Sequence, residues 1–488
     1  MNTRIRRLGI ALLVLYLALF VMLNWIQVAK RDEYNASPLN SRQTVRDFAQ
    51  SRGVIQSADG VVLAKSEPVD DRYRYLRTYP TGQLFAHITG SLSFAFGSSG
   101  IERQYNDQLA GQTAEQKVKG FIDLFIERTR LADVTLTVRN DVQTVAAQAL
   151  GEQEGSVVAL DPRTGAILAM YSWPSYDPNL LASHDFNAVK QIREQLNTAT
   201  GKPLLGNAFQ ERYFPGSTFK IVTGAAGLES GKVTASTPVY PVEQSFTPPL
   251  TTKAIGNFGG ATCGGNLVDA LRVSCNTVFA RMGLEIGAPQ MVATSEAFGF
   301  NSPMPLDLPG PVATSFFPSV ADFDRNDPKL AQSAFGQNDV QASPLHMALV
   351  AAAVANNGTM MAPHVLKEIR DSDGEQLASE PVQVWKRAMS PASALVLRDA
   401  MVEVVRAGTA TRMAIDGVTV AGKTGTAQLG TDPPSSHAWV VGFAPAEAPR
   451  VAVAVLVKAQ PGVSEVTGGR VAAPIAQQVL TAALAVTR

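Results

Sequence analysis

The segment Tyr213-Phe-Pro-Gly-Ser-Thr-Phe-Lys220 contains the most informative feature of this chain, an S-x-x-K box formed by Ser217 and Lys220. Two further boxes follow it in order, Ser274-Cys-Asn276 and Lys423-Thr-Gly425. Chance alone gives about one S-x-x-K box in a chain of this length. The ordered triple is much more specific, and it predicts a nucleophilic serine with two lysines close to it.

The S-x-x-K box is predicted to open a buried helix. Pro215 and Gly216 interrupt the chain just before Ser217, and the residues that follow are nearly all apolar up to Leu228. Ser217 and Lys220 are three positions apart and share one helix face. A serine hydroxyl needs a base, and an amine serves only when neutral, so burial or Lys423 must lower the pKa of Lys220. Alternatively, Ser217 is an ordinary N-cap and Lys220 a solvated side chain.

The S-x-N box lies where one helical segment, 267–273, gives way to another that is expected to begin near Thr277. Ser and Asn are both common helix caps, so a capping role is the simple alternative. In the catalytic interpretation, Ser274 relays a proton to the leaving amine and Asn276 hydrogen-bonds the amide of the substrate.

The K-T-G box is predicted to lie on a strand. Period-two alternation places Thr424 and Thr426 on one face, where two hydroxyls can bind a carboxylate while Lys423 supplies positive charge. Gly425 allows another backbone to approach closely. Taken alone, the segment would be an ordinary strand with a surface lysine.

Strand patterns lie at both ends of the region from about residue 140 to 488. Segments 157–160 and 167–171 flank an Asp-Pro-Arg-Thr-Gly turn, which predicts a hairpin. Segments 417–426, 439–444 and 451–457 are also strand-like, and 472–486 is expected to be a closing helix. Helical patterns fill the middle, so we expect an α+β domain in which helices pack on an antiparallel sheet.

The N-terminal part is predicted to contain a membrane anchor. Residues 8–29 carry no charge, and as a helix they would span a hydrocarbon core of about 30 Å. Arg4, Arg6 and Arg7 precede them and favour a cytoplasmic tail of residues 1–7. A cleaved signal peptide is the alternative, but no A-x-A-like site is seen near Ala29. Residues 30–139 alternate short strand-like and polar runs, including 52–55, 59–63 and 100–106, which suggests a non-catalytic pedestal.

Composition narrows the remaining possibilities. The 488 residues include 42 Lys plus Arg and 42 Asp plus Glu, so net charge gives no reason to expect nucleic acid binding. Five His and two Cys are scattered without metal-ligand spacing. We therefore expect neither a metal nor another cofactor.

With these motifs in place, the chain resembles the class B penicillin-binding proteins, most closely their actinobacterial A type. The likeness covers the anchor, the Arg52-Gly-Val-Ile and Gly100-Ile-Glu segments, the three boxes, and His437-Ala-Trp-Val-Val-Gly-Phe-Ala-Pro445. It implies a transpeptidase domain of the penicillin-binding and serine β-lactamase-like fold (140–488), behind a pedestal (30–139) and one transmembrane helix.

The resemblance also implies an activity, that of a D,D-transpeptidase that cross-links peptidoglycan in cell-wall synthesis during growth or division. Its substrates would be stem peptides, with a D-Ala-D-Ala donor and an amine acceptor, and β-lactams would acylate the same serine. The protein would sit in the inner membrane with its catalytic domain outside, near other cell-wall synthesis or division proteins. The implied catalytic residues are Ser217, Lys220 and Ser274, the substrate-binding residues are Asn276, Lys423, Thr424, Gly425 and Thr426, and the oxyanion hole is formed by the backbone N–H groups of Ser217 and Thr426.

Other classes of serine acyl-enzyme protein are alternatives to a transpeptidase. A class A β-lactamase typically has an E-x-x-x-N box between the second and third motifs, and no Glu from Asn276 to Lys423 has Asn four residues on. A β-lactam sensor would need more than seven residues before the anchor, and a bifunctional synthase would need a larger N-terminal domain. A D,D-carboxypeptidase stays open, because it differs only in using water as acceptor.

Cys263 and Cys275 are twelve positions apart, and the second lies inside the S-x-N box. Outside the membrane the two could pair, which would stabilise the protein by about 3 kcal/mol in the chain-entropy model. The resemblance requires neither cysteine, so two free thiols are the alternative. A disulfide would hold the Ser274 loop in place.

Overall fold

A computed structural model describes residues 2–28, 48–113, 116, 131–431, 435–459 and 466–487. The chain forms two compact units, which are treated separately below. The first comprises Met1–Ser51 with Ser66–Leu76, and the second Arg52–Lys65 with Arg77–Arg488.

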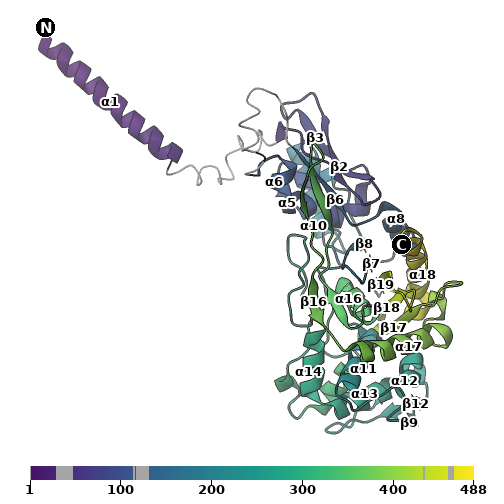
Figure 1. Ribbon diagram of the computed structural model, residues 1–488. Helices are drawn as coiled ribbons and strands as arrows, with labels where there is room; N and C mark the ends of the chain where they lie inside the picture. The colour runs from purple at the N-terminus through teal and green to yellow at the C-terminus, as the bar shows by residue number, and fades with distance from the viewer. Residues whose placement is uncertain are drawn as a thin grey trace. The chain divides into compact units, whose positions relative to one another are not determined.

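The first unit contains one long apolar helix, α1 (Asn2–Val28) (Figure 1). Its 27 residues would extend about 40 Å, enough to cross a hydrocarbon core of about 30 Å. The segment Thr3–Ile26 is long and apolar enough to span a membrane, and its side chains are almost all exposed. The predicted end of the anchor at Ala29 lies outside the described residues.

The predicted pedestal region contributes strands to a six-stranded sheet. The strand order is β15-β14-β6-β1-β2-β3, and only β1 and β6 are shown to pair in parallel. The strands are β1 (Ile55–Gln56), β2 (Val62–Pro68), β3 (Tyr75–Thr78), β6 (Ala132–Leu136), β14 (Leu366–Asp371) and β15 (Gln376–Ser379).

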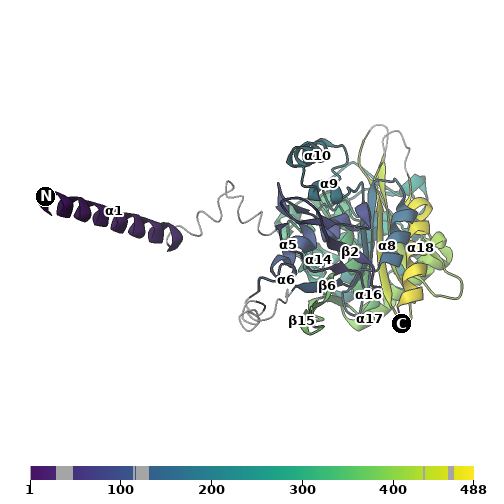
Figure 2. The ribbon, with the colours of Figure 1, turned by 90° about the horizontal axis from the view of Figure 1, so that it is seen from above.

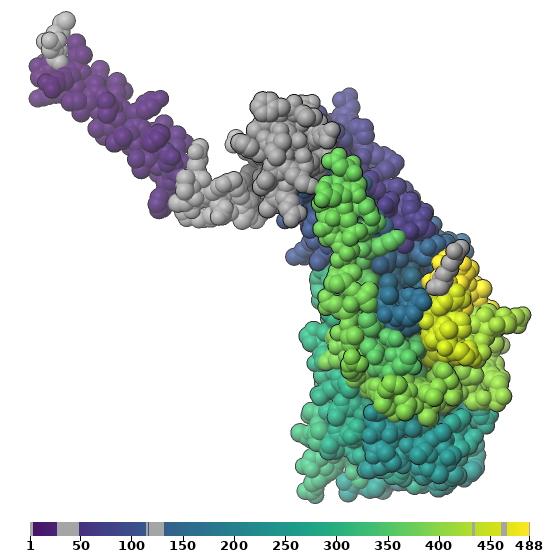
Figure 3. All heavy atoms as spheres, viewed as in Figure 1, coloured from purple at the N-terminus to yellow at the C-terminus, as the bar shows by residue number. Residues whose placement is uncertain are grey.

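Two features of this part of the chain differ from the sequence analysis. The segment that begins at Gly100 forms two short helices, α5 (Gly100–Gln104) and α6 (Asn106–Leu109), rather than a strand-like run. Strands β14 and β15 come from the predicted catalytic region, yet β14 pairs with β6. Figure 3 shows the green stretch that contains them running along the surface of the second unit.

The buried carboxylate of Glu102 connects α5 to neighbouring segments through hydrogen bonds. Glu102 accepts hydrogen bonds from Arg77 at 2.5 Å, from Arg52 at 3.3 Å and from the Tyr79 hydroxyl at 3.2 Å. The charges of Arg77 and Arg52 hold the pKa of Glu102 below its ordinary value against the opposing effect of burial. Because a buried charge is tolerated only when it is paired, this network fixes the segments that the family resemblance singled out.

The second sheet is the one predicted from both ends of the catalytic region. Its order is β17-β18-β19-β7-β8, and every pairing is antiparallel. The hairpin around the Asp-Pro-Arg-Thr-Gly turn is confirmed. The strands are β7 (Gly155–Leu160), β8 (Ile167–Trp173), β17 (Ala421–Gln428), β18 (Ser436–Ala444) and β19 (Val451–Val457).

Helices cover both faces of this sheet. Every residue of β18 and β19 is buried, as expected for strands packed on two sides. Helices α8 (Asn140–Leu150) and α18 (Gly468–Val486) lie side by side (Figure 2), and α16 (Pro344–Ala355) packs against β19, β18 and β7. Helix α18 begins four residues earlier than predicted.

The nucleophile region forms the predicted buried helix in two parts, η3 (Gly216–Phe219) and α11 (Lys220–Glu229). Residues Lys220 to Gly227 are all buried. The elements not yet named are η1 (Gly82–Phe85), α4 (Ala86–Thr89), β4 (Leu92–Ser93), β5 (Gly97–Ser98), α9 (Asn179–Ala182), α10 (Phe186–Thr198), β9 (Tyr240–Glu243), β10 (Ser245–Phe246), β11 (Ile255–Gly256), η4 (Phe258–Gly260), β12 (Cys263–Gly265), α12 (Leu267–Val273), α13 (Asn276–Ile286), α14 (Ala288–Ala297), η5 (Val320–Phe323), α15 (Asp327–Ser333), β13 (Thr359–Met361), β16 (Val384–Arg387), α17 (Pro391–Ala407) and η6 (Thr411–Met413).

Candidate active site

Ser217 lies in the first turn of η3, directly ahead of α11. The preceding Gly216 has φ of +52°, and a Cβ there would lie 2.9 Å from the carbonyl oxygen of Thr426. Its N–H donates to the carbonyl of Gly336 at 2.9 Å. Only glycine accommodates both the positive φ and the close approach, so this position seats Ser217 against strand β17.

Lys220 is fully buried beneath the cleft. Its ammonium nitrogen contacts the Ser274 carbonyl at 2.7 Å, the Asn276 Oδ1 at 2.8 Å and the Ser274 hydroxyl at 3.3 Å. Burial, and secondly the positive charge of Lys423, hold the pKa of Lys220 well below its ordinary value. Among the hydrogen bonds of the described residues, none joins Lys220 to Ser217.

That arrangement suits a neutral amine. A neutral lysine has two N–H donors and one lone pair, and the two shortest contacts of Lys220 are to oxygens that can only accept. The lone pair is then free to take a proton from a hydroxyl in the cleft. Catalytic hydrogen bonds are often long in unliganded sites and tighten only with substrate, so the missing bond to Ser217 does not exclude this role.

Ser274 occupies a left-handed conformation with φ of 63° and ψ of 41°, as the C-cap of α12. This conformation is uncommon for residues other than glycine. Helix α13 begins at Asn276, close to the predicted start near Thr277. The turn between the two helices aims the hydroxyl of Ser274 at both lysines.

Lys423 reaches the same hydroxyl from strand β17. Its ammonium nitrogen donates to the Ser274 Oγ at 2.8 Å and to the Thr424 carbonyl at 3.0 Å. Burial lowers the pKa of Lys423 to about 7. A Cβ on Gly425 would lie 2.9 Å from the Pro215 carbonyl oxygen, so this glycine brings β17 close to the Ser217 segment.

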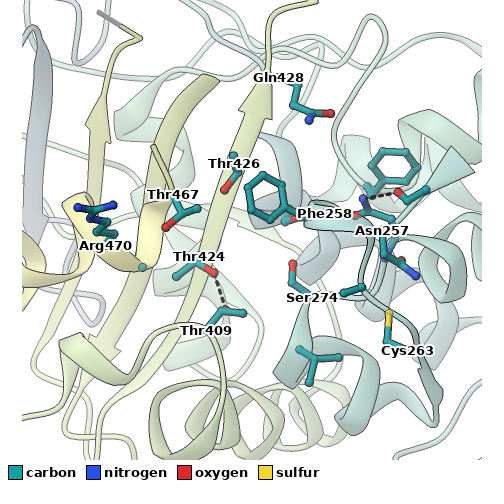
Figure 4. Close-up of a pocket in the computed structure, with 18 of the residues that line it drawn as sticks. Asn257, Phe258, Cys263, Ser274, Thr409, Thr424, Thr426, Gln428, Thr467 and Arg470 are labelled. Atoms are coloured by element: carbon teal, nitrogen blue, oxygen red, sulfur yellow. Dashed lines mark hydrogen bonds between the residues drawn. The ribbon is translucent and has the colours of Figure 1, made fainter. Parts of the chain in front are cut away.

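A cleft of about 820 Å³ opens over these residues. Ser217, Ser274, Asn276, Thr424 and Thr426 line it, while Lys220 and Lys423 lie buried behind them. Figure 4 shows Thr424, Thr467 and Arg470 on one side and Ser274, Asn257 and Cys263 on the other. The structure thus brings all three predicted boxes to one place.

Several lining residues were not predicted from the sequence. On one wall, Thr409 bonds the Thr424 hydroxyl at 2.5 Å, and Arg412 and Arg470 add positive charge. Within the described ranges, no Asp or Glu is among the lining residues. In the sequence, the Gly468-Gly469 doublet was the signal that could have indicated this wall. In the structure, a Cβ on either residue would lie within 2.2 Å of a backbone oxygen. Such doublets often mark close backbone approach.

On the opposite wall, a disulfide joins Cys263 in β12 to Cys275 in the S-x-N box. It connects the loop of Ser274 to the lobe formed by residues 239–265, named here the β9–β12 lobe. Within the described part of the chain, no group of three or more His, Cys, Asp or Glu side chains is placed to hold a metal ion.

Comparisons with known proteins identify the family to which the chain is similar. Residues 155–481 match the penicillin binding protein transpeptidase domain, and residues 52–133 match the penicillin binding protein A dimerisation domain. Peptidoglycan D,D-transpeptidase PbpA of Mycolicibacterium smegmatis is 40% identical, over 99% of both chains. PbpA of Mycobacterium tuberculosis is 37% identical, again over 99% of both.

The chain is also similar to solved structures of penicillin-binding protein A. Penicillin-binding protein A from M. tuberculosis as its ceftriaxone acyl-enzyme superposes with a TM-score of 0.83 at 36% identity, covering 90% of this chain and 100% of that one. Its penicillin G acyl-enzyme superposes with a TM-score of 0.81 at 37% identity, covering 89% and 100%.

Proposed function

The chain belongs to the class B penicillin-binding protein transpeptidases, and from this premise we propose that it cross-links peptidoglycan as a D,D-transpeptidase. One observation carries the proposal. Two buried lysines, Lys220 and Lys423, meet at the hydroxyl of Ser274 beneath a cleft that Ser217 lines. This is an arrangement for moving protons on and off a serine and an amine.

In the acylation step, the Ser217 oxygen attacks the carbonyl of the penultimate D-Ala while neutral Lys220 takes the serine proton. The backbone N–H groups of Ser217 and Thr426 stabilise the oxyanion. Ser274, between the two lysines, passes a proton to the leaving nitrogen. The C–N bond then breaks, terminal D-Ala departs as a free amine, and the acyl group stays on Ser217.

In the transfer step, an amine of a second stem peptide attacks the ester carbon. The attacking nitrogen loses a proton through the same relay, and Ser217 regains one as the ester C–O bond breaks. During the preceding acylation step, Asn276 holds the donor's amide, and Thr424 and Thr426, with the charge of Lys423 behind them, hold the carboxylate of the terminal D-Ala until it departs. Gly425 keeps β17 close enough for these contacts.

The position of the protein in the cell is part of the proposal. Helix α1 anchors the chain in the plasma membrane, and Arg4, Arg6 and Arg7 keep the N-terminus in the cytoplasm. Residues 30–139 then form a pedestal and residues 140–488 the catalytic domain, both outside the membrane. There the enzyme would act with other cell-wall synthesis or division proteins.

The direct test is a product assay on the full-length protein in detergent micelles. A donor ending in D-Ala-D-Ala is incubated with and without an amine acceptor, and products are resolved by mass spectrometry. We expect a cross-linked product and free D-Ala from the wild type, and neither from Ser217→Ala. Release of D-Ala without cross-linked product at saturating acceptor would instead identify a carboxypeptidase.

A further inference from the structure

The S-x-N box is fastened to the β9–β12 lobe at several points. The Asn276 Nδ2 donates to the Gly256 carbonyl at 3.0 Å, and the disulfide joins Cys263 to Cys275. The side chain of Asn257 provides a further connection, with hydrogen bonds both to α13 and to the lobe. Figure 4 places Asn257 on the same side of the cleft as Ser274.

Asn257 acts as a helix cap supplied from a distant part of the chain. Its Oδ1 accepts from the backbone N–H groups of Asn276 at 2.9 Å and Thr277 at 3.1 Å. The first N–H groups of a helix have no partner within the helix, and the N-cap residue Cys275 provides no side-chain bond. Asn257 therefore satisfies the first turn of α13.

The other end of the same amide is anchored in the lobe. The Asn257 Nδ2 donates to the carbonyls of Glu243 at 3.0 Å and Gln244 at 3.3 Å. Backbone N–H groups only donate and carbonyls only accept, so the orientation of the amide is fixed by its partners. With an exposed fraction of 7%, Asn257 joins the lobe to α13 through a buried link.

This link controls the amide of Asn276. Because the Gly256 carbonyl can only accept, it orients the Asn276 Nδ2 toward itself and leaves the Oδ1 facing Lys220 at 2.8 Å. The second N–H of the same amide is then available to a carbonyl in the cleft, which Asn276 lines. A shift of the α13 start would disturb both contacts.

We propose that Asn257 is a positioning residue of the acyl-transfer reaction: it fixes the start of α13 and thereby holds Asn276 against Lys220. The inference rests on the proposed function, because it concerns how the lysine base and the amide-binding residue are held. Asn257 also lines the cleft, but its side-chain amide is bonded to α13 and to the lobe. Its effect passes through Asn276.

The test compares three variants of the full-length protein by the second-order rate of acylation by penicillin. Asn257→Ala removes the whole link, and Asn257→Asp keeps an acceptor for α13 but adds a charge. The matched control is Asn179→Ala. Asn179 likewise joins distant segments, accepting from the Tyr79 N–H at 2.8 Å and donating to the Tyr79 carbonyl at 2.9 Å, and it does not line the cleft.

We expect Asn257→Ala to lower the acylation rate by about 10- to 100-fold, the range for a misplaced catalytic group, whereas Asn179→Ala stays within about twofold at a similar loss of melting temperature. Asn257→Asp should regain most of the rate at high pH, with the acid limb of its pH profile moved to higher pH. The new carboxylate would favour the charged form of Lys220.

Among the described residues, the charge of Lys423 on β17 acts on Lys220, and the nearby Glu243 carboxylate is paired with Arg281 at 2.8 Å. Equal rates for Asn257→Ala and wild type, equal losses in Asn257→Ala and Asn179→Ala, or an unmoved limb in Asn257→Asp would each overturn the inference. If Asn257→Ala does not fold, the pH profile of Asn257→Asp alone tests the inference. Failure of the wild type to acylate would instead refute the proposed function.

Discussion

Lys220 and Lys423 approach the same oxygen, the hydroxyl of Ser274, at 3.3 and 2.8 Å. Both ammonium groups come from fully buried side chains. Burial disfavours both positive charges, and the two charges also repel each other. Both lysines therefore have lowered pKa values, which favours their neutral forms. The pKa of Lys220 is held well below its ordinary value, and that of Lys423 lies at about 7.

The first prediction follows from this coupling. Lys423→Gln removes the charge that helps to lower the pKa of Lys220, so that pKa should rise while staying below its ordinary value because of burial. The neutral base then forms at higher pH, and the acid limb of penicillin acylation moves upward. Lys423→Arg keeps the charge and serves as the control. A limb at the wild-type position in Lys423→Gln would show that the two lysines are not coupled.

The second prediction concerns the base itself. Lys220→Ala should leave reversible binding of penicillin intact but slow acylation by at least about 10²-fold, the lower range for losing a positioned general base. Stopped-flow measurement of acylation against penicillin concentration separates the two effects. An acylation rate within a few-fold of wild type would reduce Lys220 to a structural role.

The site was predictable to the extent that its residues lie close together in sequence. The S-x-x-K spacing alone places Ser217 and Lys220 on one helix face, and the β7–β8 hairpin follows from two β-rich runs around a turn. The role of Asn257 was not visible, because its partners are Asn276 and Thr277, and only the tertiary fold brings them to it.

The pedestal shows the same limit. Strand β14 pairs with β6 across more than 200 positions of sequence, and no local pattern encodes such a pairing. Gly100–Gln104 forms a helix whose Glu102 is buried between two arginines. This segment was predicted to be strand-like, but it is short. Tertiary packing therefore determined its conformation more than its strand propensity did.

A third prediction tests the proposed orientation. Protease added to intact spheroplasts should digest the chain beyond α1, since within the described residues α1 is the one helix that satisfies the length and hydropathy expected of a membrane span. Immunoblots against an epitope near Ser217 and against an N-terminal tag show which part of the chain is digested on each side of the membrane. Detergent-lysed cells give the control in which both epitopes are lost. Protection of the Ser217 epitope in intact spheroplasts would reverse the proposed orientation.

A fourth prediction concerns the charge of the cleft. Arg412 and Arg470 line it. Among the described residues, neither arginine has an ion pair and no Asp or Glu lines the cleft with them. They should raise the association rate of anionic ligands. The double variant Arg412→Gln with Arg470→Gln should acylate about 5- to 10-fold more slowly with penicillin at low salt, and the deficit should shrink as salt screens the charges.

The control for this prediction is the double variant Arg398→Gln with Arg406→Gln, which makes the same charge change on α17 away from the cleft lining. The neutral methyl ester of the same penicillin provides a second comparison. If the double variant loses rate equally with the acid and the ester, the arginines contribute structure rather than electrostatic attraction.

The last prediction separates acyl transfer from antibiotic destruction. Ser217, Lys220 and Ser274 supply the groups needed to make an acyl-enzyme, but among the residues that the structure describes no Asp or Glu lines the cleft to activate a deacylating water. The sequence also lacks the E-x-x-x-N box between Asn276 and Lys423. Once penicillin has acylated Ser217, its ring-opened leaving group stays attached and shields the ester.

Detergent-solubilised full-length protein mixed with one equivalent of penicillin should therefore gain the mass of one antibiotic and keep it far longer than one turnover on a peptide substrate. Digestion should place that mass on the peptide containing Ser217, and Ser217→Ala should gain none. Recovery of the unmodified mass within minutes, with hydrolysed penicillin in solution, would require a deacylating base. Because none lines the cleft as described, that result would mean that the cleft rearranges after acylation.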